Sequence, residues 1–256
     1  MINDESQLGN VAIIGSGVIG GGWAARFALS GWSVKIFDPE KKAQTRCMEM
    51  VENARLNLPS LSDHAYPSEG PIEFCSTIES AVKNANWIQE SVPENLKIKH
   101  QVLKEIEKYA PQPTIIGSST SGFKPSTLQK GAMNPERILV THPFNPVYLL
   151  PLVEVVGHLQ ANEKKKKEAC EILKSIGMMP LIVRKEIDAH IADRFLEAVW
   201  REALWLINDD IATTEEIDDA IRFGFGLRWA QMGLFETYRL AGGEQGMTHF
   251  ISQFGP

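Results

Sequence analysis

Cysteine and metal-binding patterns are scarce in this sequence, which excludes several classes of protein. There are three cysteines, Cys47, Cys75 and Cys170, an odd number without CxxC spacing. This usage excludes a disulfide framework and predicts a reducing compartment, the cytoplasm. The six histidines show neither HxxxH nor HExxH spacing, so we expect no metal site.

Positive charge and membrane-like runs are also lacking. Lys and Arg number 26 against 32 Asp and Glu, a net charge of −6, which argues against nucleic acid or an anionic membrane as a partner. The apolar stretch Val11–Trp32 follows Asp4 and Glu5, contains Arg26 and is rich in glycine. We therefore do not expect it to be a signal or membrane segment.

What the sequence does contain is an alternation of short apolar runs and longer helical segments. The 256 residues, 43% of them hydrophobic, suffice for one large or two modest globular domains. Runs rich in Ile and Val without strict alternation are typical of strands covered on both faces. Eight such runs occur: VAIIG, SVKIFD, IEFCS, NWIQES, TIIGSS, RILVTH, LPLVEVV and MPLIVR. With helices predicted between them, at 18–30, 94–109 and 163–175, they predict a Rossmann-type, doubly wound α/β domain with a mainly parallel sheet.

The pattern changes after Glu186. Residues 191–208 carry apolar side chains at three- and four-residue steps, and no strand-like run follows. This spacing predicts a long helix that opens a smaller, all-α domain. We expect the first domain at residues 1–186 and the second at 187–256.

A glycine motif lies between the first predicted strand and the first predicted helix. Gly15 permits a tight turn, Gly17 lets the backbone approach a pyrophosphate, and Gly20 lets the helix pack closely on the strand. The helix N-terminus offers free N–H groups to phosphates. The motif consists of Gly15, Ser16, Gly17, Val18, Ile19 and Gly20.

Asp38 ends the second predicted strand, eighteen residues after Gly20. A carboxylate at this place accepts from the adenosine ribose hydroxyls and repels a 2′-phosphate, so NAD is predicted rather than NADP. A flavin uses the same fingerprint and is the main alternative. The other is a glycine-rich turn without a ligand.

Polar residues end two apolar runs, and a third run contains a glutamate, where the chemistry of a site would be expected. The run 115–122, IIGSSTSG, ends in a cluster of hydroxyls that includes Ser121, and His142 ends the run RILVTH. Ligands bind outside the carboxyl ends of strands in open α/β sheets. Taken alone, Ser121 is more often a turn residue and His142 as often structural. Glu154, inside LPLVEVV, is costly to bury unless it is paired, and a histidine is the obvious partner.

His142 and Glu154 are separated by twelve residues. An extended chain would hold their side chains ~40 Å apart, at ~3.3 Å per residue. They meet only if the chain reverses, and the segment Pro143–Pro146, PFNP, favours a turn. The pairing of a histidine base with an orienting glutamate is therefore a hypothesis that depends on this turn.

The motifs GSGVIG, SVPENLKIK, SSTSG, HPFNP and LVEVV, in this order, resemble those of the 3-hydroxyacyl-CoA dehydrogenase family of NAD-dependent enzymes. The resemblance covers essentially the whole chain. The stretches WIQESVPENL, WREALWLINDDI and GLRWAQMGLFETYRLAGGEQGM resemble one branch specifically, which oxidises the 3-hydroxyl of L-carnitine. The resemblance implies that His142 is the general base, Glu154 orients it, and Ser121 hydrogen-bonds the substrate oxygen. It further implies that Glu94 and Lys99 contact the cofactor, and that the protein is a homodimer.

Two features depart from the family pattern. The family has an asparagine before an arginine near the start of the second domain, where this sequence has Asp193 and Arg194. We include Asp193 among the catalytic residues as a hypothesis. The family's helical domain normally continues beyond the final QFGP, so either this chain is shortened or this member is reduced.

A substrate such as L-carnitine carries a trimethylammonium group without N–H donors, which aromatic rings recognise by cation–π contact. Phe144 and Phe225 are the preferred ring residues, with Ile191 and Ala192 as an adjoining wall. Lys124 is a candidate for the substrate carboxylate, although a plain surface lysine is as good an interpretation. The alternatives are a dehydrogenase for a 3-hydroxyacyl-CoA or L-gulonate, and a non-catalytic, crystallin-like NAD-binding protein.

Overall fold

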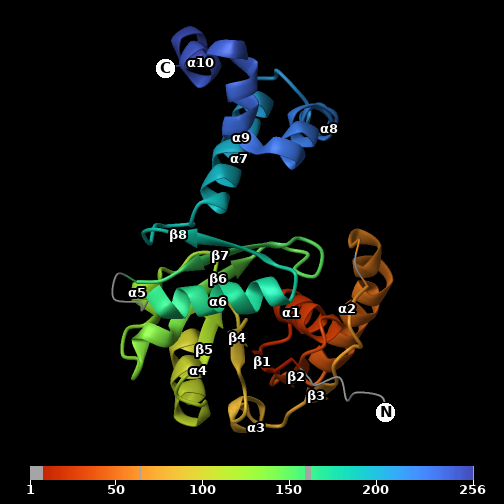
Figure 1. Ribbon diagram of the computed structural model, residues 1–256, viewed down its shortest axis with the longest axis vertical. Helices are drawn as coiled ribbons and strands as arrows, with labels where there is room; N and C mark the ends of the chain where they lie inside the picture. Colours follow the sequence, from red (N-terminus) through yellow and green to blue (C-terminus); the bar gives the residue numbers. More distant parts are fainter. Residues whose placement is uncertain (1–7, 64, 159–162, 256) are drawn as a thin grey trace. The chain divides into compact units, whose positions relative to one another are not determined.

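The computed structural model describes residues 8–63, 65–158 and 163–255 (Figure 1). Its contacts divide the chain into two compact units, Met1–Arg194 and Phe195–Pro256. They are called unit 1 and unit 2 and are described separately. The domain boundary expected at residues 186 and 187 stays a prediction.

Unit 1 is built on one eight-stranded sheet with the order β3-β2-β1-β4-β5-β6-β7-β8. Neighbouring strands are parallel except β6 and β7, which are antiparallel. The predicted doubly wound, mainly parallel sheet is confirmed, and each of the eight predicted runs matches one strand, with β1 and β6 each extending one residue beyond their runs. The strands are β1 (Asn10–Ile14), β2 (Ser33–Phe37), β3 (Ile72–Phe74), β4 (Trp87–Glu90), β5 (Ile115–Ser118), β6 (Ile138–Pro143), β7 (Leu152–Val156) and β8 (Met179–Val183).

The helices of unit 1 fill the connections between these strands. They are α1 (Val18–Leu29), α2 (Ala43–Asn57), η1 (Leu58–Leu61), α3 (Ile78–Val82), α4 (Leu96–Tyr109), α5 (Pro125–Leu128), η2 (Pro135–Arg137) and α6 (Glu163–Ser175). Helix α4 begins two residues later than predicted, because the Asn95 side chain caps it by accepting from the N–H groups of Lys97 and Ile98. Glu94 therefore lies before the helix.

Both faces of the central strands are covered, as the strand composition predicted, whereas the edge strand β8 departs from the prediction, with Met179, Leu181 and Ile182 exposed. Alternate residues of a strand point to opposite faces, and in β1 Val11 and Ile13 join one core cluster with residues of α1 and α6. Ala12 and Ile14 join a second cluster with residues of α3 and α4. The strand ends are thus held rigidly between two layers of helices.

A buried arginine adds a polar link inside unit 1. Arg26 of α1 is 5% exposed. Its Nε donates to the carbonyl of Ile176 at 2.7 Å, and its NH2 donates to the carbonyl of Gly177 at 2.6 Å. Burial lowers the pKa of Arg26. The guanidinium therefore ties the helix that follows the glycine motif to the turn that precedes β8.

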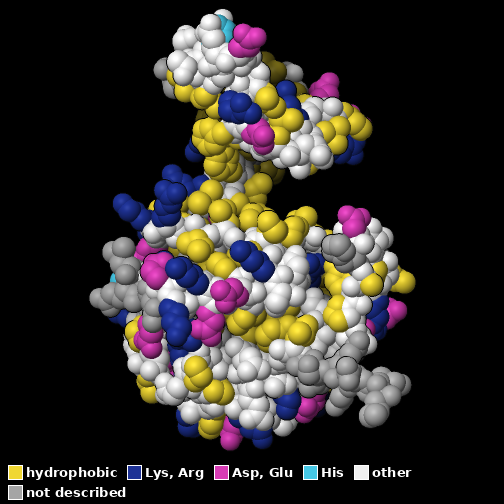
Figure 2. Space-filling model, viewed as in Figure 1, with side chains coloured by type: hydrophobic (Ala, Val, Ile, Leu, Met, Phe, Trp, Pro, Cys, Tyr) yellow, Lys and Arg dark blue, Asp and Glu magenta, His cyan; other side chains and the backbone are white. Residues whose placement is uncertain are grey.

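Unit 2 is helical, in agreement with the prediction of a smaller all-α domain. Helix α7 (Ala192–Asn208) begins at the end of unit 1 and continues into unit 2. The elements that follow are α8 (Thr214–Ala220), η3 (Ile221–Phe225), α9 (Gly226–Ala241), η4 (Gly243–Gln245) and α10 (Gly246–Phe254). Hydrophobic side chains are visible on the surface of this unit (Figure 2). Trp200 and Trp205 are both more than half exposed.

The described part of the chain has no helix that combines the length and the apolar character needed to cross a membrane.

Candidate functional site

The glycine motif opens a cavity of about 700 Å³ at the carboxyl ends of β1, β2 and β4. Gly15 has a φ of +89°, and a Cβ there would lie 2.8 Å from the carbonyl oxygen of Ser91. A Cβ on Gly20 would lie 1.8 Å from the Gly15 carbonyl oxygen, whereas Gly17 has open space beside it. The three glycines therefore do what the motif predicts: a turn, an open approach, and close packing of α1.

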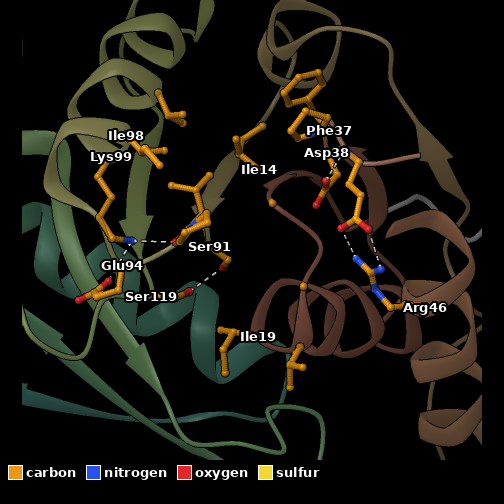
Figure 3. Close-up of a pocket in the computed structure, with 18 of the residues that line it drawn as sticks. Ile14, Ile19, Phe37, Asp38, Arg46, Ser91, Glu94, Ile98, Lys99 and Ser119 are labelled. Carbon is orange, nitrogen blue, oxygen red and sulfur yellow. Dashed lines mark hydrogen bonds and ion pairs between the residues drawn. The ribbon is translucent and has the colours of Figure 1, made fainter. Parts of the chain in front are cut away.

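Asp38, directly after β2, lies on one side of this cavity together with Arg46 (Figure 3). Its Oδ2 accepts from the N–H of Ser16 at 2.7 Å and from the Ser16 hydroxyl at 3.1 Å. Its Oδ1 accepts from the N–H of Glu40 at 2.9 Å. The carboxylate is thereby fixed beside the glycine motif, where Val18 and Ile19 also line the cavity.

The opposite side of the cavity carries Ser91, Ser119, Glu94 and Lys99 (Figure 3). The cavity falls within the range of ~300–1,000 Å³ that is usual for ligand sites. A glycine-rich turn at a helix N-terminus, with a fixed carboxylate at the end of the next strand, is chemistry that fits a dinucleotide with a free ribose 2′-hydroxyl. The residues present therefore fit NAD.

The hydroxyls at the end of β5 and directly after it differ in their contacts. Ser118 donates to Glu90 and Thr120 donates to Glu94. Ser119 Oγ accepts from Trp23 Nε1 at 3.2 Å and from Gln89 Nε2 at 2.8 Å. Ser121 is exposed and lines the cavity. Of this cluster, Ser121 is the side chain best placed to meet a ligand.

His142 and Glu154 are brought together by the antiparallel pairing of β6 and β7, in which they are direct partners. His142 Nδ1 lies 3.1 Å from Glu154 Oε2. The histidine side chain is 8% exposed and the glutamate side chain 0%. The predicted chain reversal is confirmed, because the two side chains are in contact. The catalytic role of the pair stays a proposal.

The buried carboxylate of Glu154 has further donors. The N–H groups of Ile191 and Ala192 donate to its Oε1 at 2.8 and 3.0 Å. Burial alone would raise the pKa of Glu154, but these bonds and the one from His142 outweigh it and lower the pKa. An ionised Glu154 accepts the Nδ1–H of His142, which leaves the Nε2 lone pair of a neutral imidazole open to a proton.

Three more side chains surround the imidazole. Asp193 Oδ2 lies 3.8 Å from His142 Nε2, and the ring of Phe144 lies 5.2 Å from the histidine ring. The ring of His190 is fully buried, and its centroid lies 5.4 Å from the centroid of the His142 ring. The sequence interpretation missed His190, because a histidine in a loop carries no periodic or spacing signal.

The backbone conformation and the pKa of His190 both reflect its surroundings. Its backbone φ is +51°, in the left-handed region that non-glycine residues rarely adopt. Burial and the neighbouring His142 lower the pKa of His190, against the opposing effects of Glu154, the Thr120 backbone and Asp193. We expect a neutral His190 ring beside His142 and Glu154 at neutral pH.

Other predicted residues have partners that sequence reasoning did not identify. Lys124 Nζ lies 2.9 Å from Asp188 Oδ2. Phe225 packs against Trp229 in unit 2, with ring centroids 4.7 Å apart. Among the described residues no cluster of three or more His, Cys, Asp or Glu has the arrangement of a metal site.

We predict that Asp38→Ser raises the efficiency ratio of NADP over NAD, because the substitution removes the carboxylate that repels a 2′-phosphate. The ratio is measured from kcat/KM with each cofactor. Glu171→Gln, an exposed acid on α6, serves as the control. An unchanged ratio in Asp38→Ser would remove Asp38 from ribose recognition.

We predict that Glu154→Gln loses on the order of 1–3 kcal/mol of unfolding free energy above about pH 5. The folded pKa of Glu154 lies below its ordinary value of 4.5, so its stabilisation is present above that value. The stabilisation is lost as pH falls through the folded pKa, and the gap between variant and wild type should then close. Urea denaturation across this range measures the gap, which should stay flat for Glu171→Gln. A gap independent of pH would contradict an ionised Glu154.

Comparison with known proteins supports a family assignment. The family model "3-hydroxyacyl-CoA dehydrogenase, NAD binding domain" matches residues 10–187, and the model of the C-terminal domain of the same family matches residues 190–256. A Ruegeria pomeroyi protein named L-carnitine dehydrogenase/betainyl-CoA thioesterase is 62% identical over 96% of this chain and 50% of its own length. An L-carnitine dehydrogenase of Mesorhizobium japonicum is 54% identical over 98% of this chain and 69% of its own length.

The chain thus spans about half the length of the first of these relatives. A solved structure of an NAD⁺-dependent 5-formyl-3-hydroxy-2-methylpyridine 4-carboxylic acid 5-dehydrogenase aligns with a TM-score of 0.87 and 32% identity. The alignment covers 96% of this chain and 79% of the other. The two family models together match residues 10–187 and 190–256. The chain therefore belongs to the 3-hydroxyacyl-CoA dehydrogenase family, and its first domain binds NAD.

Proposed function

We propose that this protein oxidises the 3-hydroxyl of L-carnitine to 3-dehydrocarnitine, with NAD⁺ as the hydride acceptor. The observation that carries the chemistry is the 3.1 Å contact between His142 Nδ1 and the buried, ionised Glu154. The relatives named L-carnitine dehydrogenase, at 54% identity and above, support the choice of substrate.

The proposed mechanism assigns one task to each side chain. His142 Nε2 takes the proton of the substrate hydroxyl, and Glu154 orients the ring and stabilises the imidazolium that forms. Ser121 Oγ donates to the substrate oxygen and fixes it. When bound, NAD⁺ supplies the acceptor for the hydride that leaves the carbinol carbon. His142 then returns its proton to solvent.

Recognition of the substrate is proposed to use both ends of the molecule. The trimethylammonium group needs aromatic faces and negative charge, because it has no N–H to donate. Phe144 and Asp193 flank His142 in unit 1. We propose that Lys124 exchanges its Asp188 partner for the substrate carboxylate.

The proposed function is tested by following NADH formation at 340 nm with L-carnitine, D-carnitine, 3-hydroxybutyryl-CoA and L-gulonate. L-Carnitine should be oxidised with the highest kcat/KM. A preference for the CoA ester or the sugar acid would move the protein to another activity of its family. NADH binding without turnover of any of them would favour a non-catalytic role.

In the same assay, His142→Ala should lower kcat by ~10²–10⁴-fold, the usual contribution of a positioned acid–base group. NADH affinity, measured by fluorescence, should change little because His142 is proposed to act on the substrate. Turnover retained by His142→Ala would exclude it as the base.

We predict that Asp193→Asn raises the KM for L-carnitine, since it removes a charge proposed to attract the substrate cation while keeping the side-chain shape. NADH affinity should stay at the wild-type value. The measurement is a steady-state titration of L-carnitine at saturating NAD⁺. An unchanged KM would count against a role of Asp193 in cation recognition.

Two further parts of the proposal concern the protein in the cell. A homodimer is proposed from the family resemblance, with support from exposed apolar side chains of unit 2 such as Phe195, Trp200 and Trp205. Sedimentation of the protein at a monomer mass would overturn it.

A cytoplasmic location is proposed from the unpaired cysteines, and fractionation with an exported pool would contradict it.

A further inference from the structure

Three charged side chains form a network between β4, α4 and the loop that carries Ser121. Glu90 ends β4 and is 0% exposed, Lys99 on α4 is 1% exposed, and Glu94 is 43% exposed. Lys99 Nζ lies 2.9 Å from Glu90 Oε1 and 3.3 Å from Glu94 Oε2. We call these residues the Glu90–Lys99–Glu94 network.

The inner end of the network is fixed. Glu90 Oε1 also accepts from the N–H of Val92 at 2.8 Å, and its Oε2 accepts from the Ser118 hydroxyl. Lys99 additionally donates to the carbonyl of Val92 at 3.3 Å. Each charge is therefore hydrogen-bonded on several sides, as burial of an ion pair requires.

The outer end of the network holds the serine loop. Glu94 Oε1 accepts from the Thr120 hydroxyl and, at 3.2 Å, from the N–H of Gly122. Thr120 Oγ1 in turn accepts from the N–H of Phe123 at 3.0 Å. Ser121 lies between the two residues that one carboxylate holds, and its own side chain is exposed on the cavity wall.

A buried ion pair is weak evidence for stabilisation, because well-packed apolar side chains often serve as well. Stabilisation alone therefore does not account for an ion pair at this place beside the Ser121 loop. Glu94 is partly exposed, and without the charge of Lys99 its carboxylate would be free to turn to solvent and release Thr120 and Gly122. A loop displaced by even ~1 Å can cost on the order of 10²-fold in rate.

We propose that Glu90 and Lys99 are positioning residues that act through Glu94 to hold the Ser121 hydroxyl where it meets the substrate oxygen. The inference rests on the proposed role of Ser121 in the reaction. It adds Glu90 to the functional residues and gives Lys99 and Glu94 a task beyond contact with the cofactor.

The test is a double-mutant cycle against Ser121. Lys99→Met removes the charge and keeps most of the side-chain length, and Lys97→Met, at an exposed position on the same helix, is the matched control. Each is made in the wild type and in Ser121→Ala. The readouts are kcat and KM with the substrate preferred in the panel, the NADH dissociation constant, and the melting temperature.

Lys99→Met should lower kcat by on the order of 10–100-fold in the wild type, and by less than about 3-fold in Ser121→Ala, where the hydroxyl is already gone. Any NADH affinity that Lys99→Met loses through its own contact with the cofactor should be the same in both backgrounds, and Lys97→Met should match its parent. Equal losses in both backgrounds would overturn the proposal, because the network would then act independently of Ser121. So would a tenfold loss of NADH affinity without coupling, which would make Lys99 a cofactor residue only.

Glu94→Gln keeps the test decisive if Lys99→Met does not fold. Glutamine retains an oxygen for Thr120 and Gly122 but loses the attraction to Lys99, at a partly exposed position. Its kcat should fall less than that of Glu94→Ala, and both losses should disappear in Ser121→Ala. If Ser121→Ala alone keeps full turnover, the serine role in the proposed function fails and this inference with it. If that variant is impaired but the losses add, the inference alone fails.

Discussion

The carboxylate of Glu154 lies fully inside the sheet, and an unpaired charge there would be prohibitive. Its donors come from two places: the imidazole of His142 on the neighbouring strand, and two backbone N–H groups at the start of α7. One buried charge thus ties together β6, β7 and the segment that leads into the helical unit. The orientation of the imidazole follows from the same bonds.

The parallel strands and the antiparallel pair of β6 and β7 hold different groups of residues. The carboxyl ends of β1, β2 and β4 place the glycine motif, Asp38 and Ser91 around one cavity, as open α/β sheets generally do. The reversal between β6 and β7 instead sets a histidine opposite a glutamate. The cofactor cavity and the His142–Glu154 pair are therefore supported by separate parts of one sheet.

Polar groups around the site are mostly committed to one another. Ser118, Ser119 and Thr120 all have partners from β4, α1 or the segment before α4. These hydroxyls are therefore occupied by protein partners, whereas Ser121 is exposed on the cavity wall. Lys99 is likewise committed to protein partners: its side chain is fully buried and its ammonium group pairs with Glu90.

The features that follow from local chemistry could be predicted from the sequence. A glycine turn needs particular residues at particular steps, and strands covered on both faces need continuous apolar runs, so the cofactor loop, Asp38 and eight strands were all readable. The pairing of His142 with Glu154 could be stated as a hypothesis, because proline and asparagine mark the turn and a lone buried carboxylate asks for a partner.

The sequence by itself determined the fold class, the dinucleotide loop and the residues able to do acid–base chemistry, because these depend on neighbours within a few positions along the chain. The tertiary structure decided which of them meet. Three features depend on residues from nine to 48 positions apart in the chain: the burial of His190 beside His142, the partners of Glu90, and the accessibility of the Ser121 hydroxyl. Long-range packing sets these contacts, and no local pattern encodes it.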